Sequence, residues 1–370
     1  MLNTQDGMSN FILRVSLFFL VLFAVACKST KIKSHKNLKL NFLSEYVVPD
    51  NLILDSTLVG GLSGIDYYKG KYYLACDDSN NPRVYEAKIV LDGNQISNII
   101  FEKVISIDNS SKFLDLESIR YEADLNQILL TSEGHILSQK DPLFFSIDTS
   151  GQIQKTFQIP EAFKSNSIEK PRHNATLEGL CLASDKKGYW LGMELPLEAD
   201  GPEPQYTQTK SPVRITYVSS NTNEPEKQFA YFLDAVAKKP MGHFSVNGLT
   251  DLVQYNASTF LIIERSYSSG LGNQGNTIKI FEADISDVTN TIKINNLKDT
   301  SFIPAKKKLL LNFENFRDKL TDRSIDNIEG ITLGPKLSNG HQSLILVSDN
   351  NFNKLEKQFN QFILLELIEE

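Results

Sequence analysis

The sequence predicts an all-β fold, a β-propeller of four-stranded blades. Two short motifs alternate five times along the chain, and no stretch shows the 3.6-residue periodicity of an amphipathic helix. The first motif is an apolar residue, a small or acidic residue, a small residue and an apolar residue. It occurs at 62–65, 116–119, 177–180, 249–252 and 328–331. The second motif is an apolar run that ends in an acid, at Asp77, Glu133, Glu194, Glu264 and Asp349.

Each pair of motifs is expected to form a β-hairpin, because turn residues such as Lys69-Gly70 lie between them. One or two further strand-like runs follow each hairpin, which gives about four strands per repeat. After Asp349 only 361–368 follows, so we expect 40–48 to supply the missing strand. An N-terminal strand in the last blade would close the ring and cover exposed sheet edges.

Five blades are counted directly, and the pattern leaves room for a sixth in 285–325 or 30–60. The alternative architecture is a large β-sandwich or a pair of sandwiches. A sandwich does not explain why the same acid-ended hairpin recurs five times. We therefore favour one propeller domain over residues 40–370.

The N-terminus is expected to be an export signal. Residues 15–26 form an apolar run of 12 residues after Arg14, too short to cross a membrane, where about 20 are needed. Small residues and then Cys27 follow at its end, which resembles a bacterial lipoprotein signal. We expect a signal peptide at 1–26, a lipidated Cys27 and a polar tether at 27–39, with the protein exported and anchored to the cell envelope by the lipid alone. A cleaved signal with an incidental Cys27 is the alternative.

Composition narrows the function. The chain of 370 residues is 41% hydrophobic, which supports a large core, and its net charge of −7 argues against a nucleic-acid partner. Five His and three Cys leave little for a His/Cys metal site or a disulfide framework. Any metal is therefore expected to be held by carboxylates. No segment suggests a dimerisation helix, so a monomer is expected.

In a propeller, the repeated acids would gather at one end of the central channel. Glu117, Glu178 and Glu329 of the first motif are expected to point toward a common centre, and the strand-end acids would lie around them. Carboxylates brought together raise each other's pKa unless a cation lies between them. We therefore expect these three glutamates to hold a divalent cation, Ca²⁺ by preference. Pairing of the acids with arginines and sharing of protons between the acids are the alternatives.

Basic residues stand close to these acids in the sequence. Arg120, Arg172 and Arg265 are candidates for binding an anionic substrate, because arginine holds carboxylate and phosphate groups bidentately. His173 is a candidate acid or base by its residue type. The Pro-rich segment 196–212 is expected to form a long loop that covers the site.

The repeats resemble a bacterial family, the phytase-like domain or "esterase-like activity of phytase". The most specific segments are 172–180, 263–265 and 348–352, and the resemblance extends over roughly 45–368. It implies an exported or lipid-anchored propeller and, loosely, hydrolysis of a phosphate or carboxylate ester. The metal-binding carboxylates and phosphate-binding basic residues of calcium-dependent β-propeller phytases are not matched residue by residue.

These observations predict an ester hydrolase that acts on a small anionic ester with a divalent cation. In this hypothesis Glu133 or Glu194 acts as general base, and the arginines orient the substrate. The alternative is a non-catalytic propeller that binds a ligand or a protein in the envelope, since propellers host both kinds of function.

Overall fold

The computed structural model describes residues 37–110, 112–353 and 357–370. Leu38–Glu370 form one compact unit. The predicted signal peptide, Cys27 and the tether up to residue 36 lie outside the described residues. Within the described ranges, no helix combines the length and the apolar character that a membrane crossing requires.

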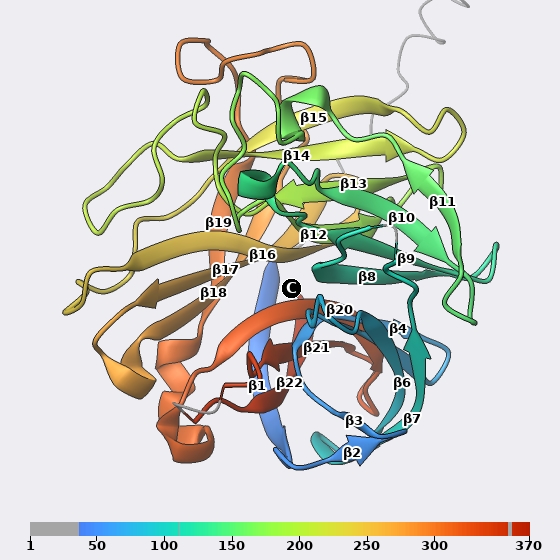
Figure 1. The fold of residues 1–370 in the computed structure, drawn as a ribbon. Helices are drawn as coiled ribbons and strands as arrows, with labels where there is room; N and C mark the ends of the chain where they lie inside the picture. The colour runs from blue at the N-terminus through green and yellow to red at the C-terminus, as the bar shows by residue number, and fades with distance from the viewer. Residues whose placement is uncertain (1–36, 111, 354–356) are drawn as a thin grey trace, which may run out of the picture. The chain divides into compact units, whose positions relative to one another are not determined.

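Five four-stranded antiparallel sheets make up this unit (Figure 1). The first sheet contains β4 (Leu62–Tyr68), β5 (Lys71–Cys76), β6 (Arg83–Asp92) and β7 (Gln95–Ser106). The second contains β8 (Leu116–Glu122), β9 (Gln127–Ser132), β10 (Leu143–Ile147) and β11 (Ile153–Phe157). The third contains β12 (Leu177–Leu182), β13 (Gly188–Met193), β14 (Pro212–Ser219) and β15 (Pro225–Phe232). The fourth contains β16 (Ser245–Asn256), β17 (Thr259–Ser268), β18 (Asn276–Asp284) and β19 (Lys306–Asn312).

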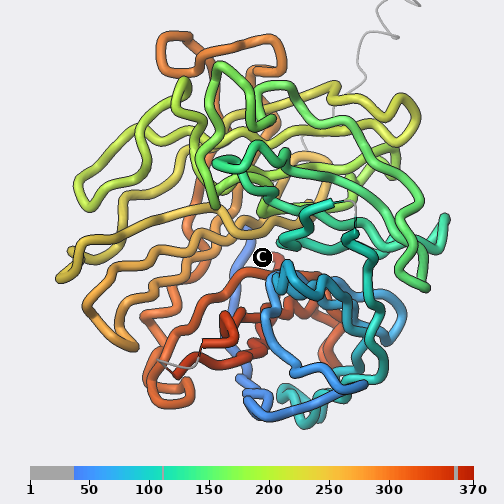
Figure 2. Tube along the Cα trace, in the orientation of Figure 1, coloured from blue at the N-terminus to red at the C-terminus, as the bar shows by residue number. Residues whose placement is uncertain are grey.

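The fifth sheet joins the two ends of the described chain. It contains β20 (Asn327–Lys336), β21 (Gln342–Asp349), β22 (Asn360–Glu369) and, at its outer edge, β1 (Leu38–Val48). β1 pairs with β22 from Leu38 opposite Glu369 to Val48 opposite Asn360, so the blue and red ends of the tube in Figure 2 lie side by side. The predicted closure by an N-terminal strand is confirmed.

The sheets are arranged as a ring. The first strand of each sheet neighbours the first strand of the next, in the order β4, β8, β12, β16, β20 and back to β4. The prediction of a propeller is therefore confirmed, with five blades in the described residues. The described parts of the two regions that could have supplied a sixth blade instead contribute β1, β19, the two-residue strands β2 (Ile53–Leu54) and β3 (Thr57–Leu58), two short 3₁₀ helices and connecting loops.

Apolar side chains fill the spaces between neighbouring blades. Trp190 on β13, for example, meets the rings of Tyr217, Phe229 and Phe260 edge-on at 5.2–5.5 Å. The last of these rings belongs to the next blade, so the contact joins two sheets. Cys76 and Cys181 are free, buried thiols. The helices are short 3₁₀ turns: η1 (Ile136–Ser138), η2 (Glu161–Phe163), η3 (Gly272–Gln274), η4 (Phe313–Lys319) and η5 (Thr321–Arg323).

Every inner strand carries a β-bulge at the first sequence motif. The pairing register shifts at 62–64, 116–119, 177–179, 249–251 and 328–330. A bulge leaves one residue outside the ladder and redirects its side chain. The small third residue of the motif has a steric reason, because a Cβ at Gly330 would lie 2.9 Å from the Ile65 nitrogen of the neighbouring blade. The small residue therefore lets the backbones of neighbouring blades approach closely at this position.

Candidate functional site

Each blade presents an equivalent residue at one end of the channel. The backbone nitrogen of Asp77 bonds to Gly61 at 2.9 Å, and the corresponding bonds join Glu133 to Asp115 and Glu194 to Thr176. In the last blade Asp349 lies opposite Asn327. In the fourth blade the residue opposite Gly248 is Arg265. The five equivalent positions therefore carry four acids and one arginine.

The assignment of Glu264 as the fourth strand-end acid is corrected by this register. Successive side chains of a strand point to opposite faces, so Glu264 and Arg265 diverge. Glu264 is buried among other partners: the Tyr231 hydroxyl donates to it at 2.7 Å, the Asn247 amide at 2.7 Å, and Lys307 forms an ion pair with it. It is not among the residues that line the channel cavity.

A cavity of about 500 Å³, which we call the acidic cavity, lies at this end of the channel. Its lining combines residues from all five blades with the loops above them. Nine carboxylates line it: Asp77, Asp115, Glu117, Glu133, Glu178, Glu194, Glu203, Glu329 and Asp349. The basic residues in its lining are Arg172, Arg265 and His173. The structure thus brings together the three predicted metal ligands and all of the predicted site residues except Arg120.

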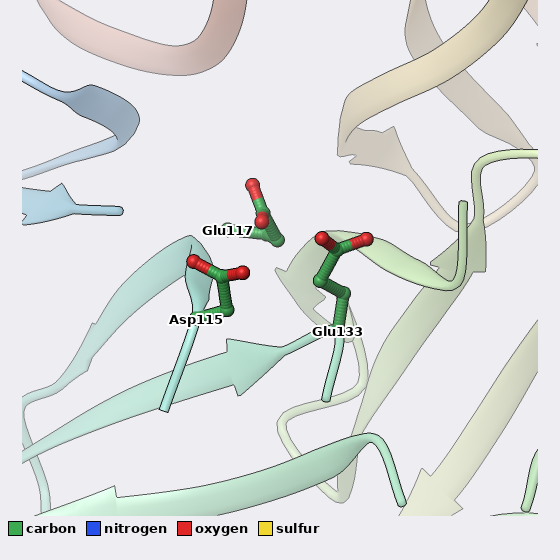
Figure 3. A group of neighbouring side chains, drawn as sticks. All are labelled: Asp115, Glu117 and Glu133. Carbon is green, nitrogen blue, oxygen red and sulfur yellow. The ribbon is translucent and has the colours of Figure 1, made fainter. Parts of the chain in front are cut away.

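Three of the carboxylates form a tight cluster. One oxygen from each of Asp115, Glu117 and Glu133 lies within 4.8 Å of the other two. Figure 3 shows the three side chains facing a common space, with Asp115 just before β8, Glu117 on β8 and Glu133 at the end of β9. Asp115 and Glu133 are cross-strand neighbours, and the bulge turns Glu117 toward them.

The acidic cluster fits a hard divalent cation. Oxygens that bind one Ca²⁺ at 2.3–2.6 Å lie at most about 5 Å apart, which is the spacing found here. Glu133 is only 4% exposed, and its Oε2 atom has no hydrogen-bond partner within the described residues. Asp115, Glu117 and Glu178 form no ion pair among the described residues either. A buried acceptor without a partner is costly, and a cation would satisfy it.

Burial and mutual repulsion raise the pKa values of these carboxyls. Burial, followed by the charge of Asp115, raises the pKa of Glu133 to about 9. Burial and then Asp77 raise the pKa of Asp115 to about 7. Burial and then Glu178 hold the pKa of Glu117 well above its usual range, and burial and then Glu194 do the same for Glu178. Without a cation the cluster therefore retains protons at neutral pH.

Arg265 forms a second, oppositely charged side of the cavity. Its Nη2 atom lies 3.3 Å from Glu194 and 3.7 Å from Glu329, and its Nε atom has no partner within the described residues. Burial raises the pKa of Glu194 to about 7 and that of Glu329 to about 8, and Arg265 opposes both shifts. Asn327 donates to Glu329 at 2.7 Å. The unpartnered Nε–H group is available to donate a hydrogen bond to a bound anion.

Arg172 lines the cavity but uses its guanidinium to hold the loop above it. Its three nitrogens donate to the Pro196 carbonyl at 3.0 Å, to Glu203 at 2.9 Å and to the Gly201 carbonyl at 3.1 Å. Through Glu203 the Pro-rich loop contributes to the cavity wall, as the sequence suggested. Arg172 therefore positions the loop in this structure, whereas the prediction gave it a direct role in substrate binding.

His173 also lines the cavity. Its ring packs against His135 with the centroids 4.3 Å apart, and its buried Nδ1 atom has no hydrogen-bond partner in the described part of the chain. Burial and then His135 lower its pKa, so the neutral imidazole is favoured. A neutral imidazole can accept or donate a proton.

Arg120 is the predicted site residue that the structure places elsewhere. It is 3% exposed and forms an ion pair with Asp251 at 3.0 Å. It also donates to the Ile119 carbonyl on its own strand and to the carbonyls of Ile65, Leu252 and Ile331 on three other inner strands. It does not line the cavity, so the prediction that it binds substrate is wrong.

Two functional residues were missed from the sequence. Asp115 completes the acidic cluster, and Asn327 connects Glu329 with Asp349. The spacing Asp115-Leu116-Glu117 was an available signal, because residues two apart on a strand share a face. Asn327 directly precedes a first motif, in the position that Asp115 holds in the second blade, so alignment of the repeats could have identified it.

No curated protein matches the sequence. Among solved structures, a glutaminyl cyclase from Myxococcus xanthus is 8% identical, with 90% of this chain and 99% of that chain covered at a TM-score of 0.41. A putative glycoside hydrolase from Bacteroides ovatus is 10% identical, with coverage of 82% and 86% and a TM-score of 0.41. The propeller assignment rests on the strand order and not on these likenesses. A family model described as phytase-like, "esterase-like activity of phytase", matches residues 57–352, well over half of the sequence, and the chain therefore belongs to this family.

Proposed function

We propose that the chain is an ester hydrolase that binds a divalent cation, Ca²⁺ by preference, in the acidic cavity and cleaves a small anionic ester there. The observation that carries the proposal is the cluster of Asp115, Glu117 and Glu133, with its unpartnered Glu133 oxygen. Membership in a family described by esterase-like activity supports the reaction type. A phosphate or a carboxylate ester would fit.

The cation is assigned to the acidic cluster, and this changes two predicted roles. Glu133, predicted as a general base, becomes a ligand together with Asp115 and Glu117. Glu329, predicted as a ligand, lies beside Arg265 instead. Glu178 lies near the cluster, because its charge raises the pKa of Glu117 more than any other charge does. When bound, the cation would supply positive charge for the anionic ester and would acidify water for attack.

The remaining residues of the cavity have separate tasks. Arg265 orients the anion through its free Nε donor. Glu194, with a pKa near 7, is matched to accepting a proton from water at neutral pH. His173 lies on the rim with a free Nδ1 atom and is placed to exchange a proton with the leaving alcohol.

The reaction is tested with p-nitrophenyl phosphate, bis-p-nitrophenyl phosphate and short p-nitrophenyl acyl esters, each with Ca²⁺ or with a chelator. We expect turnover that requires the cation and falls by at least a hundredfold in Glu133→Gln. Glu102→Gln on β7, which pairs with Lys88 far from the cavity lining, is the matched control. Cation binding without turnover of any ester would make the chain a non-catalytic binding propeller.

We also propose that the protein is exported, is anchored to the envelope through a lipid on Cys27, and acts as a monomer. The apolar run and the small residues before Cys27 support this. Metabolic labelling with a radioactive fatty acid should mark the wild-type chain and leave Cys27→Ala unlabelled. Labelling that persists in the variant would remove the anchor from the proposal.

A further inference from the structure

A second cavity of about 730 Å³ opens beside the acidic cavity. The two share Arg265, Asn327 and Asn351 in their linings, so they are continuous. One wall consists of the end of β17, η3 and the start of β18. The other consists of the residues that lead into β20 and of Asn351, Asn353, Lys357 and Gln358 between β21 and β22. We call this cavity the amide groove, because Asn273, Asn276, Asn327, Asn351 and Gln358 line it together with Tyr267. Its volume is within the range of about 300–1,000 Å³ typical of ligand pockets.

We propose that the amide groove binds an uncharged polyhydroxylated group, such as a sugar ring, that forms the alcohol part of the ester substrate. This inference rests on the proposed function and extends it to a substrate class. Side-chain amides offer donors and acceptors in fixed pairs, which suit neighbouring hydroxyls. An aromatic ring such as that of Tyr267 offers an apolar face to the C–H face of a sugar.

Two residues that line the groove each have a buried amide oxygen without a hydrogen-bond partner within the described residues. These oxygens are Oδ1 of Asn276 and Oε1 of Gln358. Both atoms are acceptors, so the ligand that satisfies them must donate, as a hydroxyl does. Arg265, whose Nε atom is also without a partner among the described residues, lines both cavities. An anion on Arg265 would thus leave the attached alcohol in the groove.

Hydrogen bonds and ion pairs fix the backbone of the wall that carries Asn276. Arg317 donates to the backbone carbonyls of Asn273 and Asn276 at 3.0 and 2.8 Å, and it forms an ion pair with Glu314 at 2.6 Å. Lys238 also pairs with Glu314, at 2.8 Å. Tyr267 and Asn276 are direct partners in the β17–β18 ladder. A wall fixed in this way is preorganised for binding, because little freedom is lost when a ligand arrives.

The charges of the groove favour a neutral ligand over a polyanion. Its lysine, Lys357, is paired with Asp322 at 2.7 Å, and its arginine faces Glu194 and Glu329. Asp326 adds a buried carboxyl to the lining. A ligand with many phosphates would be repelled by these acids and by the nine carboxylates of the adjoining acidic cavity. One anionic group near Arg265 and hydroxyls in the groove match the lining better.

The test compares two esters with the same reacting group and similar leaving alcohols. Glucose 6-phosphate carries the sugar ring and ethyl phosphate lacks it; 6-O-acetylglucose and ethyl acetate form the corresponding pair if acyl esters are the ones hydrolysed. With Ca²⁺ present, we expect kcat/KM at least tenfold higher for the sugar ester. Asn276→Leu and Tyr267→Ala should remove this preference and leave turnover of the ethyl ester unchanged. Asn221→Leu, at an exposed turn between β14 and β15, is the control that should keep it.

The outcomes test the groove proposal and the proposed hydrolase reaction separately. Equal turnover of both esters would overturn the groove proposal and leave the hydrolase standing. If neither ester is cleaved, the hydrolase fails, and calorimetric titration of the same proteins with glucose and glucose 6-phosphate decides the groove. Binding that Asn276→Leu weakens at least tenfold would support it, and wild-type binding that is absent or unchanged in the variant would overturn it.

Discussion

Two groups of buried charges lie on or beside the inner strands, and they differ in how their charges are matched. Arg120 and Asp251 are 3% and 0% exposed and satisfy each other, while Asp251 also accepts from Ser118, Leu180 and Ile331. Together their bonds reach all five inner strands. The acidic cavity, in contrast, contains nine carboxylates, and the buried Oε2 atom of Glu133 has no hydrogen-bond partner among the described residues.

The difference separates a structural role from a functional one. A buried ion pair with its lone pairs and protons satisfied needs nothing from solution. A buried cluster of like charges is unfavourable by itself and is best explained by what it binds. The repeated bulges place both groups of charges along the same ring of blades. At the position of Asp251 the other blades carry small residues, which leaves room for the side chains of Arg120 and Asp251.

The largest expected effect comes from breaking the Arg120–Asp251 pair. Arg120→Met should lower the free energy of unfolding by about 3–5 kcal/mol, because it leaves Asp251 buried and unpaired. Urea unfolding followed by far-UV circular dichroism measures this. The double variant Arg120→Met/Asp251→Leu should recover much of the loss. A single variant as stable as the wild type would mean that the pair does not tie the ring.

Cation binding should stabilise the cavity by a smaller amount. At a Ca²⁺ concentration about 100 times its Kd, the free energy of unfolding should rise by about 2.7 kcal/mol, visible as an increase in Tm. Glu133→Gln should abolish the increase, since it removes a ligand from the three-carboxylate cluster. Glu102→Gln should retain it. An increase that survives in Glu133→Gln would place the cation elsewhere.

Without a cation, stability should fall as pH rises through the range in which the cavity acids titrate. Their pKa values are raised on folding, so the folded state binds more protons and loses stability with increasing pH. The loss begins above the unfolded pKa values near 4 and ends at about 6 for Asp77, 7 for Asp115 and Glu194, 8 for Glu329 and 9 for Glu133. Each proton of difference gives a slope of about 1.4 kcal/mol per pH unit.

Thermal unfolding in chelator between pH 5 and pH 9 checks this dependence. Saturating Ca²⁺ should remove most of the slope, because the cation binds the charged carboxylates. A chelated protein that gains stability from pH 6 to pH 9 would show that the cavity acids are matched by charges of the fold, as Asp251 is.

The smallest effect is expected at the Arg172–Glu203 pair. Glu203 is 45% exposed, so this pair should contribute less than about 1 kcal/mol to the free energy of unfolding. A double-mutant cycle with Arg172→Ala and Glu203→Ala measures the coupling. Arg172 also holds the loop through two backbone carbonyls. Arg172→Ala should therefore raise KM, whereas the free energy of unfolding should fall only a little. A coupling comparable to that of Arg120 and Asp251 would contradict this ranking.

The fold was predictable because the propeller repeats itself. Alternating apolar residues and turn residues recur five times, and the missing strand after β21 required a partner from the N-terminus. The cluster of glutamates was predictable for the same reason, since equivalent residues of a ring meet at its axis. The sequence motif itself did not show that Glu117, Glu178 and Glu329 stand at bulges.

By itself, the sequence determined the class of fold, the closure of the ring and the gathering of acids at one end of the channel, because these follow from local patterns repeated in order. Only the tertiary structure decided which side chain of the Glu264-Arg265 pair faces the cavity, since that depends on the register with β16. It alone decided that Arg120 pairs with Asp251, 131 residues away, and that Asp115 completes the cluster. Ion pairs and metal sites depend on distances of a few ångströms between distant segments, and chain packing sets those distances.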